Sequence, residues 1–196
     1  MSSIKISDAQ ELRAHFEELI HLTDEEFASI LSYFTVKKLK KHQFLIQTGD
    51  HVRHSYWVKK GLLKATFIDD KEKEHIIQFA MENWWITDYQ AYFTQTQAIV
   101  NVDCLEDSEL YCLSYENREK LCSELQKVEY FFRKKANSGF VALQKRMLSL
   151  LSNNIKERYE ILLSQYPDLF QRVSKTIIAS YLGVSRESLS RLNSRL

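Results

Sequence analysis

Three charged side chains near the end of the chain, Arg186, Glu187 and Arg191, have the chemistry needed to read nucleic-acid bases. An arginine can donate two hydrogen bonds to O6 and N7 of guanine, and a glutamate can accept one from N4 of cytosine. Their spacing puts them on the outer side of a short helix whose inner positions are Leu189 and Leu192. These residues therefore predict sequence-specific readout of a DNA major groove.

The side chains around these three suit contacts to phosphate. Hydroxyl groups and lysines bind the nucleic-acid backbone and set register without reading sequence. The predicted phosphate contacts are Lys175, Thr176, Ser185 and Ser188, and Ser190 shares the outer face of the second helix. Residues 171–196 hold five cations and one anion, a local net charge of +4, whereas the whole chain has +1. The basic charge is concentrated where a DNA-binding element is expected.

The element that must position these side chains is a pair of short helices in residues 173–196. Ser174 suits the N-cap of the first helix, Gly183 suits a left-handed position after its end, and Ser185 suits the N-cap of the second. This order predicts a C-terminal helix-turn-helix whose second helix enters the major groove. The alternative is an amphipathic helix pair with a solvated face of arginines and serines.

Upstream of this pair, the hydrophobic pattern changes twice. Residues 8–33 have helical spacing, with a capping box from Thr23 to Glu26. Residues 36–113 contain about seven short strand patterns separated by turns, which is typical of an antiparallel sandwich or barrel. Residues 115–125 and 128–166 are predicted to be helical again, with a break near residues 152–154.

The long helix carries two stripes of positions that are apolar except for Asn154, and the first stripe has alternating steps of four and three. The first stripe consists of Ala136, Phe140, Leu143, Met147, Leu150 and Asn154. A neighbouring stripe consists of Val141, Leu148, Leu151 and Ile155. The first spacing is that of a coiled-coil seam, so a second copy of the chain is one expected occupant. The alternative is a single wide stripe that faces the chain's own core.

The composition limits the other function classes. With 44% hydrophobic residues, one Pro and four Gly, the chain can bury a core and has few flexible linkers. We find no apolar run of ~18 residues and no signal-peptide pattern at the start, so we expect a cytoplasmic protein with no membrane association. Three cysteines without a CxxC pair disfavour zinc, disulfides and an iron–sulfur cluster.

This order of elements resembles the CRP/FNR superfamily, the cyclic-AMP receptor protein and fumarate–nitrate regulator group. The resemblance covers nearly the whole chain and is most specific in residues 178–192, IASYLGVSRESLSRL. It continues in the turn QTGD at residues 47–50 and the hairpin VKKG at residues 58–61. It implies base-reading roles for Arg186, Glu187 and Arg191.

The fold class that the resemblance implies is α+β. We expect an N-terminal antiparallel β jelly roll flanked by helices in residues 1–126, a dimerisation helix in 127–155 and a helix-turn-helix in 156–196. Members of the family usually continue beyond the position of Leu196, so the wing is expected to be minimal or absent.

The predicted sensor departs from the family's nucleotide-binding pattern. Members that bind a cyclic nucleotide carry Gly-Glu and, about ten residues later, Arg followed by Ser or Thr. Here Thr87-Asp88 stands at the first position and Gln97-Ala98 near the second, with no Arg or Lys between Glu74 and Arg118. A cyclic phosphate would lack its charge-assisted partner, which disfavours cyclic-AMP binding.

The segment that replaces this pattern is rich in aromatic residues and leaves two interpretations open. It could line a pocket for another, neutral or apolar ligand, or its rings could fill the vacated space. The predicted ligand-binding residues are Trp85, Thr87, Asp88, Tyr89, Gln97 and Ala98. Asp88 would orient a polar group of the ligand, or cap a helix and need no ligand.

Together these features predict a DNA-binding transcription regulator and not an enzyme. No catalytic residue, metal site or cofactor is predicted; His42, His51, His54 and His75 are expected to be solvated and not to hold haem or a cupin-type metal. The expected partners are double-stranded DNA, a second copy of the chain, RNA polymerase and an unidentified small-molecule effector. The alternative is a ligand-binding jelly roll whose helical tail docks a protein partner.

Overall fold

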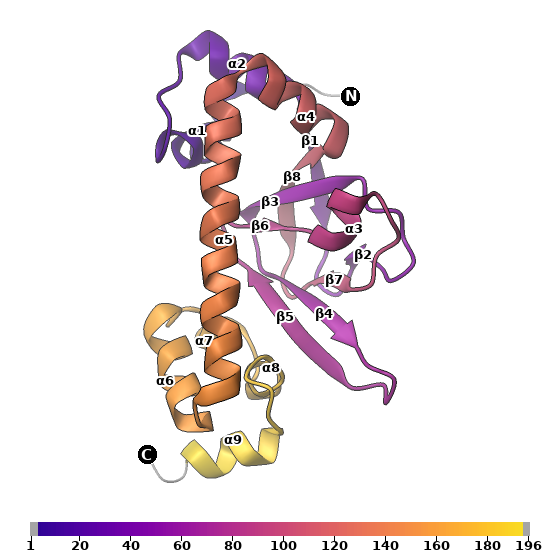
Figure 1. Cartoon of the computed structure of the whole chain (residues 1–196), viewed down its shortest axis with the longest axis vertical. Helices are drawn as coiled ribbons and strands as arrows, with labels where there is room; N and C mark the ends of the chain where they lie inside the picture. The colour runs from indigo at the N-terminus through magenta and orange to yellow at the C-terminus, as the bar shows by residue number, and fades with distance from the viewer. Residues whose placement is uncertain (1–3, 194–196) are drawn as a thin grey trace. The chain divides into compact units, whose positions relative to one another are not determined.

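The strands form two four-stranded sheets in a computed structural model that describes residues 4–193, with side chains as far as residue 191 (Figure 1). The order in the first sheet is β1, β8, β3, β6, and in the second β2, β7, β4, β5. The strands of the first sheet are β1 (Phe34–Leu39), β3 (His54–Lys60), β6 (Trp85–Ile86) and β8 (Ser108–Ser114). Those of the second are β2 (Phe44–Ile46), β4 (Leu63–Ile68), β5 (Glu74–Ala80) and β7 (Asn101–Cys104).

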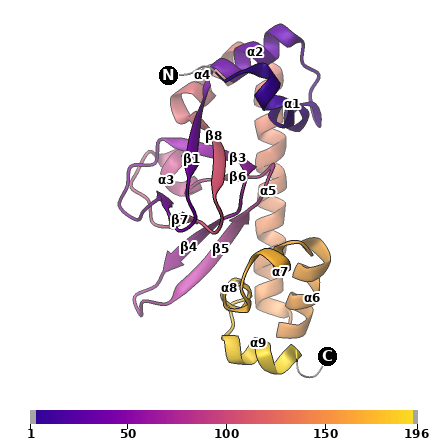
Figure 2. The same cartoon turned by 180° about the vertical axis from the view of Figure 1, so that it is seen from behind.

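The long-range pairing of the first sheet joins the two ends of the β region. β1 pairs antiparallel with β8, so that Phe34 lies opposite Leu113, and the two strands lie side by side in Figures 1 and 2. β8 also pairs antiparallel with β3, with Trp57 opposite Tyr111. This two-sheet arrangement confirms the predicted jelly-roll type of fold.

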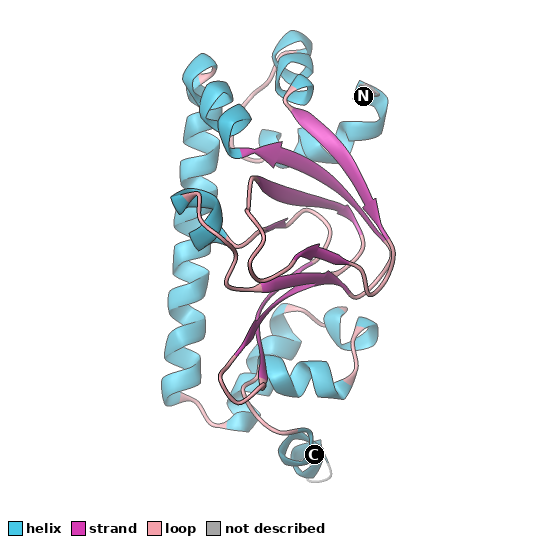
Figure 3. Cartoon of the chain, turned by 90° about the vertical axis from the view of Figure 1, so that its right-hand side faces the viewer, coloured by secondary structure: helices cyan, strands magenta, loops and turns pink. Residues whose placement is uncertain are grey.

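The helices precede, interrupt and follow the strands along the chain. Figure 3 distinguishes the helices from the strands by colour. A 3₁₀ turn (Ile6–Ala9), α1 (Gln10–Glu17) and α2 (Asp24–Ser32) precede the strands, and α3 (Tyr89–Thr94) interrupts them. After β8 come α4 (Tyr115–Glu124), α5 (Gln126–Ser152) and α6 (Ile155–Gln165). The chain continues with α7 (Leu169–Arg172), α8 (Lys175–Tyr181) and α9 (Arg186–Asn193).

Contacts divide the chain into two compact units. The first contains Met1–Thr66 and Phe79–Lys135, and the second contains Phe67–Gln78 and Ala136–Leu196. The first unit thus holds most of the strands with the N-terminal helices, α4 and the first turns of α5. The second holds the rest of α5, the later helices and the tip of the β4–β5 hairpin.

The two central strands of the first sheet, β3 and β8, are buried on both faces, and their side chains alternate between two cores. Tyr56 and Val58 of β3 face the apolar cluster shared with the second sheet, whereas Trp57 belongs to the cluster with the helices. β8 repeats the pattern, with Leu110 on the first side and Tyr111 on the second. Since side chains alternate along a strand, one sheet serves both cores.

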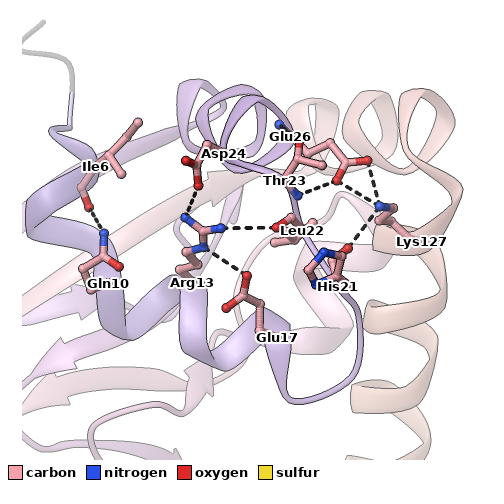
Figure 4. A network of polar contacts seen from close by, with 10 residues as sticks. All are labelled: Ile6, Gln10, Arg13, Glu17, His21, Leu22, Thr23, Asp24, Glu26 and Lys127. Atoms are coloured by element: carbon pink, nitrogen blue, oxygen red, sulfur yellow. Dashed lines mark hydrogen bonds and ion pairs between the residues drawn. The ribbon is translucent and has the colours of Figure 1, made fainter.

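The N-terminal helices are fixed to the start of α5 by polar contacts (Figure 4). Thr23 and Glu26 form the predicted capping box, with Glu26 N–H donating to Thr23 Oγ1 at 3.2 Å. Lys127 Nζ donates to Glu26 at 2.7 Å and to the carbonyl of His21 at 3.0 Å. Arg13 links α1 to α2 through Asp24 at 2.6 Å. The loop between α1 and α2 is therefore held from both sides.

The break predicted in the long helix is confirmed. α5 ends at Ser152, and Asn154 is the N-cap of α6, with a capping box to Glu157. Asn154 and Ile155, the last members of the two predicted stripes, therefore lie outside the long helix. The short elements β6 and α7 were not predicted, and α3 was expected only in the alternative that Asp88 caps a helix. Each has two to six residues, too few for a hydrophobic period to emerge.

Among the helices of the described residues, none combines the length and the apolar character that crossing a bilayer requires.

The turn at Gly61, in the predicted VKKG hairpin, leaves no room for a side chain. Its φ is +107°, and an added Cβ would lie 2.8 Å from the Asp107 carbonyl oxygen and from Ser108 Cα. Gly49 has a similar φ of +93° but open space around it. We expect Gly61→Ala to lower the free energy of unfolding by about 2 kcal/mol more than Gly49→Ala, because only the former adds a backbone clash to the strain. Urea denaturation of both variants measures the difference; equal losses would contradict the packing argument.

Candidate nucleic-acid interface and ligand-binding segment

The first helix of the C-terminal pair is closed at its N-terminus by the predicted residue. Ser174 caps α8, and its hydroxyl accepts a hydrogen bond from Ile177 N–H at 3.4 Å. Ile178 and Ala179 are buried, while Lys175 and Thr176 are exposed in the first turn. The two predicted phosphate contacts therefore lie on the solvent side of α8, next to its positive end.

The turn between α8 and α9 depends on a left-handed glycine. Gly183 has a φ of +71°, and Val184 N–H donates to the Ala179 carbonyl at 3.0 Å. This is the helix C-terminal arrangement that the sequence predicted from Gly183. Leu182 and Leu189 are buried on either side of the turn, so the two helices share one small apolar core.

The second helix presents its predicted reading side chains to solvent. Ser185 Oγ accepts from Ser188 N–H at 3.2 Å and so starts α9. Arg186, Glu187, Ser190 and Arg191 are exposed, and Leu189 is 1% exposed. Leu192, which was also predicted to be buried, lies outside the residues whose side chains are described. The helix thus has one inner and one outer face, as the pattern predicted.

Two of the predicted phosphate contacts take part in a hydrogen-bond row along α9. The hydroxyl groups of Ser185 and Ser188 lie 3.2 Å apart, and Arg191 donates to Ser188 Oγ at 3.5 Å. Residues three apart share one face of a helix, so the row restrains the guanidinium of Arg191. An arginine held in this way loses less side-chain entropy on binding a base or a phosphate.

Glu187 remains an acceptor in this basic surrounding. A hydrogen bond from its own backbone N–H, followed by one from the Ser185 hydroxyl, lowers the pKa of the Glu187 carboxyl, and Arg186 and Arg191 add to the effect. An ionised carboxylate at this place can accept from the N4 amino group of cytosine.

Asp88, in the predicted ligand-binding segment, uses its carboxylate inside the protein. It is 4% exposed and caps α3, where Oδ1 accepts from Ala91 N–H at 3.0 Å. Oδ2 accepts from the N–H groups of Ile99 at 2.8 Å and Val100 at 3.2 Å. The N-terminus of a helix and two loop amides together make a site that would suit an anion, and Asp88 supplies that anion itself.

The residues on either side of Asp88 also have internal partners. Thr87 Oγ1 donates to the His54 carbonyl at 2.9 Å, and Trp85 Nε1 donates to His15 Nε2 at 3.2 Å. The ring of Trp85 packs edge-on against Phe132 of α5 at 5.5 Å. Trp85 therefore joins the sheet to two helices and does not line an open pocket.

The remaining predicted ligand-binding residues lie in two different surroundings. Ala98 is buried and exchanges backbone hydrogen bonds with Gly49 and Asp50 at 2.9 and 2.8 Å. Tyr89 and Gln97 are exposed, and Tyr89 stacks on Phe93 at 6.3 Å. The six residues thus do not converge on one described cavity.

The space between the two sheets is filled by side chains. Tyr56, Ile86 and Tyr92 are buried there, with many smaller apolar residues around them. A cavity near Gln97 has a volume of about 110 Å³ and is lined by His51, Val52, Arg53, Gln95 and Thr96. Small-molecule sites usually measure ~300–1,000 Å³. A larger open depression of about 460 Å³ is lined by residues 17–21 and includes none of the predicted ligand-binding residues.

His15 is a partner of this segment that sequence analysis did not single out. It is 5% exposed, and its ring lies 5.7 Å from that of Trp57 and 5.4 Å from that of Phe131. Burial, and then the charge of Lys135, lower the pKa of His15 to about 4, although Glu18 opposes the shift. A lone histidine on an amphipathic helix gives no signal of such a place, because its partners come from distant strands.

Within residues 4–193, the His, Cys, Asp and Glu side chains form no group that could hold a metal ion.

A family model for the cyclic nucleotide-binding domain matches residues 36–124. Along more of its length, the chain is 24% identical over 170 residues to the fumarate and nitrate reduction regulatory protein of Vibrio cholerae, a match that covers 81% of this chain and 67% of that protein.

Two solved structures share the fold. FixK2 from Bradyrhizobium japonicum has a TM-score of 0.73 and 16% identity, covering 83% of this chain and 84% of that one. The c-di-GMP responsive global regulator CLP of Xanthomonas campestris has a TM-score of 0.73 and 15% identity, covering 88% and 91%. The likeness thus extends beyond the β region to the C-terminal helices.

Substitution of Asp88 tests how much its hydrogen bonds to three backbone amides stabilise the fold. We expect Asp88→Ala to lower the free energy of unfolding by roughly 3 kcal/mol, because three backbone N–H groups lose their acceptor. Asp88→Asn should also destabilise, since an amide nitrogen cannot accept from Ile99 and Val100. Asp70→Ala removes an exposed carboxylate and is the control. A loss for Asp88→Ala no larger than the control's would contradict the assigned role.

The lowered pKa of His15 predicts that the stability of the fold falls as the pH falls below 6.5. Its pKa is about 4 in the folded chain, against 6.5 for a solvated histidine, so above pH 6.5 it is neutral in both the folded and the unfolded chain and contributes nothing. As pH falls below that value, the unfolded chain binds a proton that the folded chain excludes, and stability drops by about 1.4 kcal/mol per pH unit until pH 4. Thermal unfolding between pH 7 and pH 4.5 measures the drop. His15→Gln keeps an acceptor for Trp85 but does not titrate, and should show a flatter profile; parallel profiles would refute the assignment.

Proposed function

Because this chain belongs to the CRP/FNR superfamily of regulators, we propose that it is a transcription regulator that binds specific double-stranded DNA through α8 and α9. The observation that carries the proposal is the outer face of α9. Arg186, Glu187 and Arg191 are exposed on this face, while the N-terminus of α9 is capped by Ser185 and its inner residue Leu189 is buried. A helix built in this way fits the DNA major groove.

The exposed apolar face of α5 supports a homodimer. Phe140 is 70% exposed and Leu151 is 77% exposed, values that a single chain leaves unexplained. Other members of the two stripes are also more than 40% exposed: Val141, Leu143, Met147, Leu148 and Leu150. A second copy of the same helix would cover this face with matching steps of three and four residues. A symmetric dimer would then offer two α9 helices to two half-sites of the DNA.

The contacts around Asp88 argue against the binding of cyclic AMP. The amides of Ala91, Ile99 and Val100 are taken by the Asp88 carboxylate. No Arg or Lys occurs between Glu74 and Arg118 to neutralise a cyclic phosphate. In this proposal residues 1–126 are the sensor, 127–155 mediate dimerisation and 156–196 bind DNA.

The same proposal includes RNA polymerase as a partner and a cytoplasmic location, since a regulator acts where the chromosome is transcribed. An effector other than cyclic AMP would have to use residues outside the amides that Asp88 occupies.

The experiment that tests the function is electrophoretic mobility of genomic DNA fragments with the full chain. We expect retardation of a subset of fragments, with an affinity that falls steeply as salt is raised, because phosphate contacts release counterions. If no fragment is retarded at any salt concentration, the proposal fails. The alternative of a jelly roll whose helical tail docks a protein partner would then be favoured.

Removing the side chain of Arg186 and removing that of Lys175 should weaken DNA binding in different ways. On a fragment selected for tight binding, we expect Arg186→Ala to cost about 1–3 kcal/mol and to relax preference at one base pair. Lys175→Ala should weaken specific and non-specific DNA alike and reduce the salt slope by about one. Lys156→Ala, an exposed cation on α6, serves as the control for loss of charge. Competition binding with single-base variants of the fragment measures both effects. An equal loss on all sequences for Arg186→Ala would argue against base reading.

A further inference from the structure

One arginine of the long helix connects three segments of the second unit. Arg146 of α5 donates to the carbonyl oxygens of Ile76 at 2.7 Å and of Ile77, both in β5, and to that of Tyr181 at 3.1 Å, at the end of α8. Its guanidinium also stacks on the ring of Tyr181, 3.7 Å from the centroid. No sequence pattern indicates this role for Arg146, because its partners are backbone groups far away in the chain.

Arg146 completes the C-terminal cap of α8. The last four carbonyls of a helix have no partner within it. In α8, three of these carbonyls accept hydrogen bonds from N–H groups just beyond the helix. The donors to Ile178, Ala179 and Ser180 are Leu182, Val184 and Gly183, respectively. The fourth, at Tyr181, accepts from Arg146. A cation at the negative end of a helix adds a favourable interaction with its dipole.

A second side chain fastens the same end of α8 to the hairpin. Ser180 Oγ donates to the carbonyl of Glu74 at 3.0 Å. The hairpin tip is itself ordered, because Asp69 accepts from the N–H groups of Lys71 and Lys73 at 2.9 and 3.0 Å and contacts His75 at 2.8 Å. The end of α8 is therefore attached to a preformed hairpin at two points.

The attachment is made on the inner side of the helix pair. Arg146 is half-buried, and burial lowers the pKa of its guanidinium. The side chains proposed to read bases, Arg186, Glu187 and Arg191, are exposed on α9 and are not covered by these contacts. The hairpin contact thus leaves the proposed base-reading face exposed, so the contact can position α8 without blocking DNA. We call the hydrogen bonds of Arg146 and Ser180 to β5 and α8 the brace.

We propose that Arg146 is a positioning residue for DNA binding. It fixes the angle between α8 and the part of α5 that carries the exposed apolar face. Through the turn at Gly183 it fixes α9 as well. In a dimer formed along α5, this angle sets the separation of the two α9 helices and hence the half-site spacing that the protein accepts. The inference rests on the proposed function and adds the element that sets its geometry.

The test compares Arg146→Met and Arg146→Lys with Lys145→Met in the full chain. Methionine keeps the length but removes the donors, lysine keeps the charge and one donor group, and Lys145 is an exposed neighbour on the same helix. Affinity is measured for a selected fragment, for unrelated DNA, and for fragments with one to three base pairs inserted between the half-sites. Amide hydrogen exchange of residues 74–78 and 180–184 reports on the brace without any DNA.

We expect Arg146→Met to speed exchange in both segments and to weaken binding of the selected fragment roughly 10-fold. Binding to unrelated DNA should change less than that, and the preference among half-site spacings should flatten. Arg146→Lys should recover part of the affinity and of the spacing preference, and Lys145→Met should behave as the parent chain. This pattern would not follow from general destabilisation, which would weaken both kinds of DNA binding together.

Two outcomes would overturn the inference. If Arg146→Met exchanges faster at residues 74–78 yet matches Lys145→Met on every DNA, the brace has no positioning role. If it binds the selected fragment more tightly, the hairpin contact inhibits binding. If the parent chain retards no DNA, the proposed function itself fails and this inference falls with it, so the two failures are told apart by the parent chain alone.

Discussion

The burial of two adjacent phenylalanines at the start of α5 is the contact on which the other features depend. Phe131 is fully buried and lies 4.3 Å from the ring of Phe16, and Phe132 meets the ring of Trp85 at 5.5 Å. Burying each such ring contributes about 1.5–3 kcal/mol. These contacts fix the first turns of a helix of 27 residues whose later turns hold the exposed apolar face. The helix is thus anchored at one end, while its later turns leave an apolar face exposed.

The same contact explains the aromatic character of the segment around Trp85. Its indole binds His15 of α1 and packs on α5, so this strand end serves the helical core. Asp88, three residues later, occupies three backbone amides with its own carboxylate. The chain's own side chain therefore satisfies these amides without a bound anion.

The helix pair proposed to bind DNA, α8 and α9, has helix ends that are capped by groups of the chain itself. Ser174 and Ser185 close the two N-termini, and Arg146 takes the last carbonyl of α8. A reader assembled in advance loses less entropy on binding than one that must order itself. The row from Ser185 through Ser188 to Arg191 extends this order to a side chain proposed to contact bases.

The sequence was enough to predict the local features: the capping box at Thr23, the helix break near residues 152–154, the left-handed turn at Gly183 and the two faces of α9. Each depends on residues at most a few positions apart, so spacing and residue type suffice to predict it. The contacts of the Asp88 carboxylate with the amides of Ile99 and Val100 are visible only in the tertiary structure, as are those of His15 with Trp85 and of Arg146 with Tyr181. The Asp88 and Arg146 contacts depend on backbone groups from distant segments, and a backbone carbonyl or amide is the same at every position of a sequence. The His15–Trp85 hydrogen bond joins side chains that are 70 positions apart, and no short spacing in the sequence indicates such a pair.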